Sequence, residues 1–152
     1  MTAKDTAGGI APPPLIFLAG LIAGFLLDHF LAWPGMTTQV AAGLALLGLG
    51  LILMFLGIRE FERAGTDYRP YKPTTRIITG GPFRFTRNPL YLSLALIYAG
   101  LALAHGSFWA LVLLGPVLIV IRYGVIAREE RYLEARFGAD YLNYKNSVRR
   151  WL

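Results

Sequence analysis

Residues 39–58 read QVAAGLALLGLGLILMFLGI and contain no charged side chain. A helix of about 20 apolar residues rises ~30 Å, which matches the hydrocarbon core of a bilayer. The run also holds Gly43, Gly48, Gly50 and Gly57, and small residues let membrane helices approach closely. The stretch therefore predicts a membrane-spanning helix with close helix neighbours.

Three more apolar runs of similar length flank this one along the chain. Their shared feature is a near absence of charge, and they cover residues 15–33, 89–105 and 107–127. Between the second and third runs, residues 59–88 are polar and interrupted by glycine and proline, which predicts a long loop. Residues 128–152 alternate apolar and charged positions, which predicts amphipathic helices at the membrane interface. The expected fold is all-α: a single domain over residues 1–152 with four transmembrane helices and an interfacial tail.

The first apolar run could instead be the core of a cleaved signal peptide. However, Lys4 is balanced by Asp5, and no small-x-small cleavage motif follows the run. We therefore expect it to remain as the first transmembrane helix.

Basic residues are concentrated at one side of the predicted membrane. Of 15 Lys and Arg, seven lie within residues 59–87 and six within residues 128–150, whereas residues 34–38 and 105–106 carry none. The positive-inside rule then places both termini and the central loop in the cytoplasm, for example of a bacterial inner membrane. Basic residues that flank lipid-buried helices do not favour nucleic-acid binding. The oligomeric state is not indicated.

Composition excludes several kinds of chemistry. The chain has no cysteine, so disulfides, thiolate nucleophiles and cysteine metal sites are excluded. Its two histidines, His29 and His105, lie far apart in sequence and have no nearby carboxylate cluster of ligand spacing. We therefore expect no metal site.

Charged residues at the ends of the apolar runs are candidates for function, because lipid penalises unpaired polar groups. Asp28 and His29 could form a proton relay, but beside Trp33 an interfacial anchor is the favoured interpretation. Arg122 could form a buried ion pair with Glu129 or Glu130 if the helix is continuous. Two adjacent glutamates near the negative end of a helix repel each other and the helix dipole, and a bound cation could offset this repulsion.

Two separated blocks of sequence carry a resemblance to a known family. Residues 79–91 read TGGPFRFTRNPLY, and after an apolar span come REERYL at 128–133 and FGADYLNY at 137–144. In this order they resemble the isoprenylcysteine carboxyl methyltransferase and phospholipid methyltransferase superfamily, and the resemblance extends from Gly65 to the C-terminus. No Gly-x-Gly-x-x-Gly motif follows a strand, so a Rossmann-type methyltransferase is excluded.

The resemblance implies that S-adenosylmethionine binds in a cytoplasmic pocket made by the third helix, the fourth helix and the tail. A lipophilic small molecule or a prenylated substrate would enter from the bilayer. Glu129 would suit the cofactor's ammonium, and Arg87 or backbone N–H groups near Pro89 would take its carboxylate. Tyr91, with Ile77, Ile78 and Phe83, would form a wall for the adenosine. The residues implied to bind the cofactor are Arg76, Ile77, Ile78, Phe83, Asn88, Pro89, Leu90, Tyr91 and Glu129, with Ile77 and Ile78 in a strand-like segment. Catalytic positioning roles are implied for Arg87, Asn88 and Glu130.

Three positions depart from the family pattern. Asn88 stands where many members have His, Ser93 where they have Gly, and Val125 where the better-known enzymes have an arginine for the substrate carboxylate. An amide can orient a substrate but cannot remove a proton. We therefore expect an acceptor that is already deprotonated, such as a carboxylate or a thiolate, and a prenylcysteine substrate is not assured.

Two other classes of function are open from the sequence. Membrane sterol reductases, which use NADPH, resemble the same superfamily in their C-terminal half, although the short loop and single Glu-Glu block favour the methyl donor. A non-enzymatic four-helix transporter or scaffold would place its coupling charge near the middle of the membrane, whereas Glu129 and Glu130 fall at its edge.

Overall fold

The computed structural model describes residues 8, 10–31, 36–69 and 72–152. These residues form helices and loops without strands. The elements in chain order are α1 (Pro13–Phe30), α2 (Val40–Ala64), a 3₁₀ turn η1 (Gly81–Arg84), α3 (Pro89–His105), α4 (Phe108–Ile121), a π-helical segment η2 (Arg122–Ile126), α5 (Ala127–Phe137) and α6 (Ala139–Ser147). Trp33 and the first two residues of the 34–38 connector, Pro34 and Gly35, lie outside the described residues.

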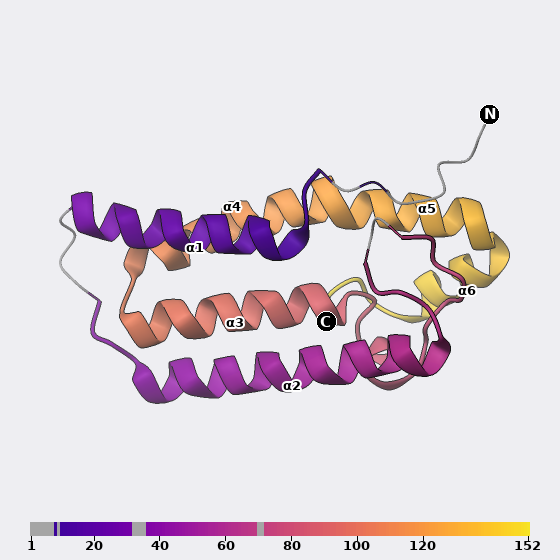
Figure 1. Ribbon diagram of the computed structural model, residues 1–152, viewed down its shortest axis with the longest axis horizontal. Helices are drawn as coiled ribbons and strands as arrows, with labels where there is room; N and C mark the ends of the chain where they lie inside the picture. The colour runs from indigo at the N-terminus through magenta and orange to yellow at the C-terminus, as the bar shows by residue number, and fades with distance from the viewer. Residues whose placement is uncertain (1–7, 9, 32–35, 70–71) are drawn as a thin grey trace.

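The four long helices lie side by side (Figure 1), with α2 packed on α3, α1 on α4, and α3 joining the two pairs. Three of the four glycines of the α2 apolar run lie against α3. A Cβ atom added at Gly43 would lie 2.6 Å from the carbonyl oxygen of Gly100, so the two backbones touch. Gly50 and Gly57 are similarly close to α3, whereas Gly48 has no described atom within 4 Å of such a Cβ. The predicted close packing is therefore correct at three of the four positions and wrong at Gly48.

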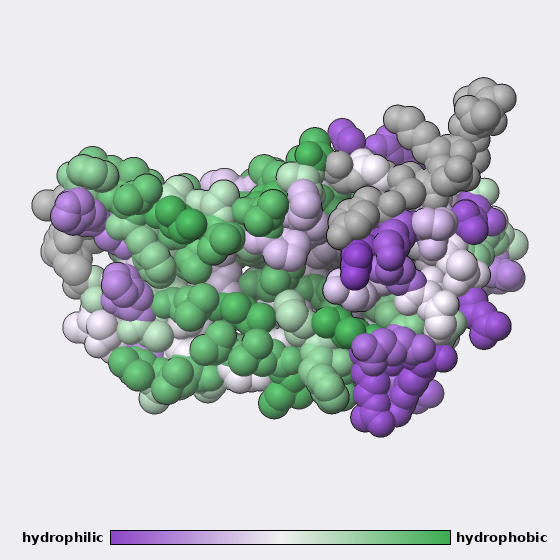
Figure 2. Space-filling model, viewed as in Figure 1, coloured by the Kyte–Doolittle hydropathy of each residue, from purple (hydrophilic) through white to green (hydrophobic). Residues whose placement is uncertain are grey.

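The bundle has the length and composition of a membrane protein. Helix α1, helix α2 and the continuous helix Phe108–Phe137 are each long and apolar enough to cross a bilayer, and α3 is a shorter apolar helix. Figure 2 shows hydrophobic residues over most of the bundle's length and hydrophilic ones gathered towards the end that carries α5 and α6. The all-α class predicted from the four apolar runs is confirmed.

Helix α2 extends beyond the expected boundary at Ile58 and ends at Ala64. Charge does not end a helix: arginine and glutamate are good helix formers, and Arg63 pairs with Glu60 at 2.7 Å one turn away. The helix ends at Gly65, whose φ of 64° is left-handed and whose N–H caps the last turn.

Asp28 connects the ends of α1 and α4. Its carboxylate accepts hydrogen bonds from the Ser107 hydroxyl and, at 3.3 Å, from the backbone N–H of Trp109. The His29 ring packs edge-on against Phe30, with centroids 5.1 Å apart. This end of the bundle is opposite α5 and α6 (Figure 1), so Asp28 joins two helix ends far from the hydrophilic end of the bundle.

Candidate active site

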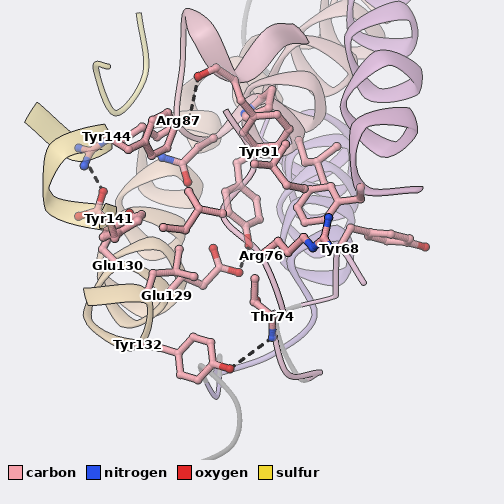
Figure 3. A pocket seen from close by; sticks show the side chains of 18 of the residues that line it. Tyr68, Thr74, Arg76, Arg87, Tyr91, Glu129, Glu130, Tyr132, Tyr141 and Tyr144 are labelled. Atoms are coloured by element: carbon pink, nitrogen blue, oxygen red, sulfur yellow. Dashed lines mark hydrogen bonds and ion pairs between the residues drawn. The ribbon is translucent and has the colours of Figure 1, made fainter. Parts of the chain in front are cut away.

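A pocket lies at the hydrophilic end of the bundle, between the central loop, the start of α3, α5 and α6 (Figure 3). Every residue implied by the family resemblance lines it: Arg76, Ile77, Ile78, Phe83, Arg87, Asn88, Pro89, Leu90, Tyr91, Glu129 and Glu130. Ile77 and Ile78 lie in loop and not in a strand. The structure thus brings these residues together, while their roles stay predictions.

Glu129 faces Tyr91 across the pocket. The Tyr91 hydroxyl donates a hydrogen bond to Glu129 Oε1 at 2.7 Å, and the two side chains point towards each other in Figure 3. Within the described part of the chain, no Lys, Arg or His forms an ion pair with Glu129. A carboxylate that lines a cavity in this way can accept a cationic group from a ligand.

Arg87 has two hydrogen-bond donors without partners. Its side chain is only 8% exposed, and Nη2 lies 3.3 Å from Glu130 Oε1. Nε and Nη1 are buried without a hydrogen-bond partner among the described residues. Leaving a buried polar group without a hydrogen bond costs about 1–3 kcal/mol, and the cost is higher for a charged group. Two such donors lining a pocket are suited to an anionic group of a ligand.

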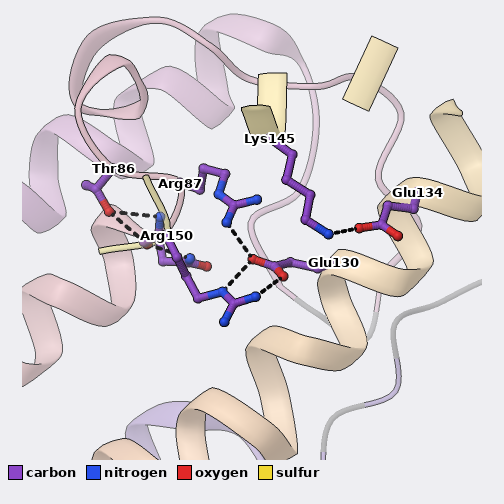
Figure 4. Close-up of polar contacts among 7 residues, drawn as sticks. Thr86, Arg87, Glu130, Glu134, Lys145 and Arg150 are labelled. Atoms are coloured by element: carbon purple, nitrogen blue, oxygen red, sulfur yellow. Dashed lines mark hydrogen bonds and ion pairs between the residues drawn. The ribbon is translucent and has the colours of Figure 1, made fainter. Parts of the chain in front are cut away.

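Glu130, adjacent in sequence, is engaged within the protein. Arg150 donates to it from Nε at 2.9 Å and from Nη2 at 2.7 Å, so Glu130 lies between Arg150 and Arg87 (Figure 4). The two glutamates therefore differ: Glu130 is neutralised by arginines, and Glu129 remains available to a ligand. The expected need for a bound cation does not extend to Glu130.

The ion pair considered between Arg122 and these glutamates does not form. Arg122 is exposed, and its guanidinium lies over the Tyr123 ring at 5.4 Å from the centroid. The reason is the π-helical segment η2, because the expected ion pair assumed a regular α-helix from Arg122 to Glu130. One extra residue in a turn rotates everything after it by ~100° relative to an α-helix, which changes the faces that Glu129 and Glu130 present.

Backbone carbonyls of the C-terminal residues contact the segment before α3, beside the pocket. The resemblance implied that the tail takes part in this pocket, but it gave no role to Arg149 or Arg150. The Arg150 carbonyl accepts hydrogen bonds from Asn88 Nδ2 at 2.9 Å and from Thr86 Oγ1 at 3.2 Å, and the Arg149 carbonyl accepts one from Arg87 N at 2.9 Å. The Asn88 amide is thereby held by the tail.

Aromatic residues missed by the sequence interpretation complete the wall; they are Phe61, Tyr68, Tyr132, Tyr141 and Tyr144. The Tyr144 hydroxyl donates to the Phe83 carbonyl at 2.7 Å, which joins α6 to η1. Burial, with a smaller effect of the Glu130 charge, raises the pKa of Tyr141 to about 12, so its phenol is neutral at pH 7. Tyr132, Tyr141 and Tyr144 lie within the two family blocks of the tail, which gave a signal for them, whereas Phe61 and Tyr68 had none.

The cavity is small, at about 110 Å³. Most ligand sites enclose roughly 300–1,000 Å³, so a nucleoside-sized ligand requires the walls to move apart. One wall is the loop that contains Thr74, whose N–H reaches the Tyr132 hydroxyl at 3.3 Å. A hydrogen bond of this length is weak, and breaking it costs about 0.5–1.5 kcal/mol.

An apolar helical bundle with a charged pocket at its hydrophilic end is the architecture of a membrane protein with a polar site near the bilayer surface. The chain belongs to the phospholipid methyltransferase family, because that family's sequence model matches residues 38–140. Membership of this family indicates a membrane methyltransferase. The matched region contains Arg87, Glu129 and Glu130, and also Val125, which is fully buried.

Comparison with individual proteins adds one relative. A protein of Haemophilus influenzae, described as an uncharacterized protein, is 48% identical over 65 residues, which is 41% of this chain and the whole of that protein. No solved structure shows significant similarity to the chain.

Proposed function

We propose that the protein is an S-adenosylmethionine-dependent methyltransferase that acts on a lipophilic or membrane-bound substrate, similar to isoprenylcysteine carboxyl O-methyltransferase. The observation that carries the proposal is the pairing of opposite charges in one pocket. Among the described residues, two Arg87 donors have no hydrogen-bond partner and Glu129 has no cationic side chain in an ion pair with it. An amino acid group carries both an ammonium and a carboxylate, and these two side chains match it.

The residues of the pocket fit the cofactor in chemistry. Glu129 would hold the cofactor's ammonium, and Tyr91 would keep the Glu129 side chain in place through its hydrogen bond. Arg87 would hold the cofactor's carboxylate. Phe83, Ile77 and Ile78 provide an apolar wall for the adenine ring. The cofactor, when bound, supplies a methyl group on a sulfonium for in-line displacement.

The protein's own part in the reaction would be positioning and exclusion of water. Correct alignment of two reactants can contribute roughly 7–11 kcal/mol to lowering a barrier. Asn88 lines the pocket, but an amide has no basic group that could remove a proton. Its orientation is fixed by the hydrogen bond to the Arg150 carbonyl. This supports an acceptor that arrives deprotonated, such as a carboxylate or a thiolate.

The distribution of charge supports a cytoplasmic site. The pocket lies at the end of the bundle where Arg76, Arg87 and the basic tail gather, and the positive-inside rule assigns this end to the cytoplasm. We infer an inner-membrane protein whose termini are cytoplasmic and whose substrate reaches the pocket from the bilayer.

Calorimetric titration of the purified protein tests the cofactor assignment. We expect S-adenosylhomocysteine to bind and NADPH not to bind. Glu129→Gln should lower the affinity at least tenfold, whereas Glu62→Gln, at an exposed glutamate of α2, should leave it unchanged. Binding of NADPH without S-adenosylhomocysteine would overturn the proposal in favour of a membrane reductase.

Methyl transfer itself requires an activity assay. Radiolabelled S-adenosylmethionine is incubated with the protein and either membrane lipid extract or a model prenylcysteine. Labelled product in one arm identifies the acceptor class. Absence of transfer to every acceptor, despite cofactor binding, would leave a cofactor-binding protein that is not an enzyme.

A further inference from the structure

A second hollow lies over the seam between α2 and α3, on the other side of η1 from the active-site pocket. It encloses about 680 Å³ and shares no lining residue with that pocket among the described residues. Its apolar part is lined by leucines of two helices, Leu49, Leu53 and Leu56 from α2 with Leu92 and Leu96 from α3. We call it the α2–α3 groove.

The α2–α3 groove has the dimensions of one leaflet. Leu49, Leu53 and Leu56 follow the i, i+4, i+7 spacing of one helix face. From Leu49 to Arg59 the helix rises ~15 Å, half of a ~30 Å hydrocarbon core. The apolar length therefore suits the acyl chain of a lipid in the leaflet next to the hydrophilic end.

The hydrophilic end of the groove is positively charged. Arg59, Arg63 and Arg84 line it, and Glu60 is the one acidic side chain in its described lining, so the lining side chains carry a net charge of +2. Leu152, with its terminal carboxylate, also lines the groove. Glu60 is already bound to Arg63 at 2.7 Å. Arg59 and Arg84 form no ion pair with any described residue. A phosphate at this end would find two available guanidinium groups.

The η1 turn separates the groove from the active site. Phe83 is buried in the active-site pocket, while Arg84 and Phe85 line the groove. Phe85 is 73% exposed, and an exposed aromatic ring beside arginine is typical of the membrane interface. This places the positively charged end of the groove at headgroup depth.

We propose that the α2–α3 groove is a binding site for a glycerophospholipid with an anionic headgroup that has no ammonium, such as phosphatidylglycerol. An acyl chain lies along the leucines, and the phosphate is bound by Arg59 and Arg84. A zwitterionic headgroup is disfavoured because its ammonium would need a carboxylate, and Glu60 is engaged by Arg63. The lipid is distinct from the methyl acceptor, since the groove and the active-site pocket are lined by different residues.

Lipid binding is measured on the full-length protein in mild detergent by native mass spectrometry. Phosphatidylglycerol, phosphatidylcholine of the same acyl chains, and inorganic phosphate are titrated separately. The test variant is Arg59→Gln with Arg84→Gln. The matched control is Arg128→Gln with Arg131→Gln, which removes the same charge from α5 residues outside the groove. S-adenosylhomocysteine binding is measured on each variant.

We expect phosphatidylglycerol to bind at least tenfold more tightly than phosphatidylcholine, and inorganic phosphate not to bind. The test variant should lose this preference, the control should keep it, and both should bind S-adenosylhomocysteine as the parent protein does. Equal loss in both variants would mean a general attraction of basic residues to anionic lipid and would overturn the site. No preference in the parent protein would overturn it as well. Because cofactor binding is read separately, failure of the lipid site and failure of the proposed function are distinguishable.

Discussion

Arg150 binds Glu130 through two parallel hydrogen bonds, from Nε at 2.9 Å and from Nη2 at 2.7 Å. Glu130 in turn lies 3.3 Å from Arg87 Nη2. By neutralising Glu130 from the tail, Arg150 leaves the remaining Arg87 donors free for a ligand. The last residues of the chain thus act on the pocket without lining it.

Replacing Arg150 with Gln should therefore weaken both the fold and the site. Glu130 would keep Arg87 alone as its partner, and Arg87 would be drawn towards it. Because the Arg150 side chain is 30% exposed, we expect a destabilisation of about 1–3 kcal/mol, less than for a fully buried pair. The melting temperature in detergent and the affinity for S-adenosylhomocysteine should both fall.

The control for this change is Arg149→Gln, at an exposed neighbouring arginine, which should alter neither measurement. Arg150→Lys should recover only part of the loss, since an ammonium cannot make the two parallel bonds. Full recovery by lysine would show that charge alone, and not the bidentate geometry, holds Glu130.

Tyr91→Phe should lower cofactor affinity without unfolding the protein. The change removes the hydroxyl that binds Glu129 at 2.7 Å and leaves the carboxylate less well oriented. Hydrogen bonds to charged groups contribute about 1.5–3 kcal/mol, which corresponds to a loss of roughly tenfold to a hundredfold in affinity. Calorimetry with S-adenosylhomocysteine measures it.

Helix α3 supplies its own control in Tyr98. This hydroxyl is buried and has no hydrogen-bond partner among the described residues, so Tyr98→Phe should leave cofactor affinity unchanged. If the two variants bind the cofactor equally well, the contact between Tyr91 and Glu129 has no role in the site.

The apolar runs were enough to predict the helical class, because a stretch such as residues 39–58 has few alternatives to crossing a bilayer. The helix ends were harder. Charge at Arg59 suggested an end, but only Gly65 adopts the left-handed conformation that caps α2.

The sequence predicted which residues form the site but not the contacts between them, because the blocks shared with the family identify residues and not their partners. Arg87, Tyr91 and Glu129 could be placed near one another from the resemblance alone. The contact between Glu130 and Arg150 could not be predicted. A turn at Gly138 and the short helix α6 separate the two residues, so no helical periodicity places them on one face. The π-helical segment η2 likewise has no hydrophobic pattern that distinguishes it from an α-helix.

Stability should fall at alkaline pH through the tyrosines of α6. Burial raises the pKa of Tyr141 to about 12 and also raises that of Tyr144, so the folded state favours the neutral phenols. This stabilisation is fully present below the unfolded pKa of ~10 and is lost as the pH rises towards 12. Tyr141→Phe should make the melting temperature less sensitive to pH between 9 and 11, roughly in that alkaline window.

An exposed tyrosine provides the comparison for this pH effect. Tyr123→Phe should leave the slope of melting temperature against pH unchanged, because that side chain is 64% exposed. A slope that is the same in the parent protein and in both variants would show that the α6 tyrosines do not control alkaline stability.

Glycine at position 43 should be required for the packing of α2 on α3. A Cβ there would lie 2.6 Å from the Gly100 carbonyl oxygen and 2.7 Å from Ala104 N, and these are backbone atoms that cannot turn aside. Gly43→Ala should therefore separate the helices and destabilise the protein by about 1–3 kcal/mol, as overpacking does. Gly48→Ala meets no described atom within 4 Å and should be neutral or stabilise by up to about 1 kcal/mol through helix propensity. Thermal unfolding of the two variants in the same detergent decides the matter: equal melting temperatures would mean that α2 and α3 are not in backbone contact.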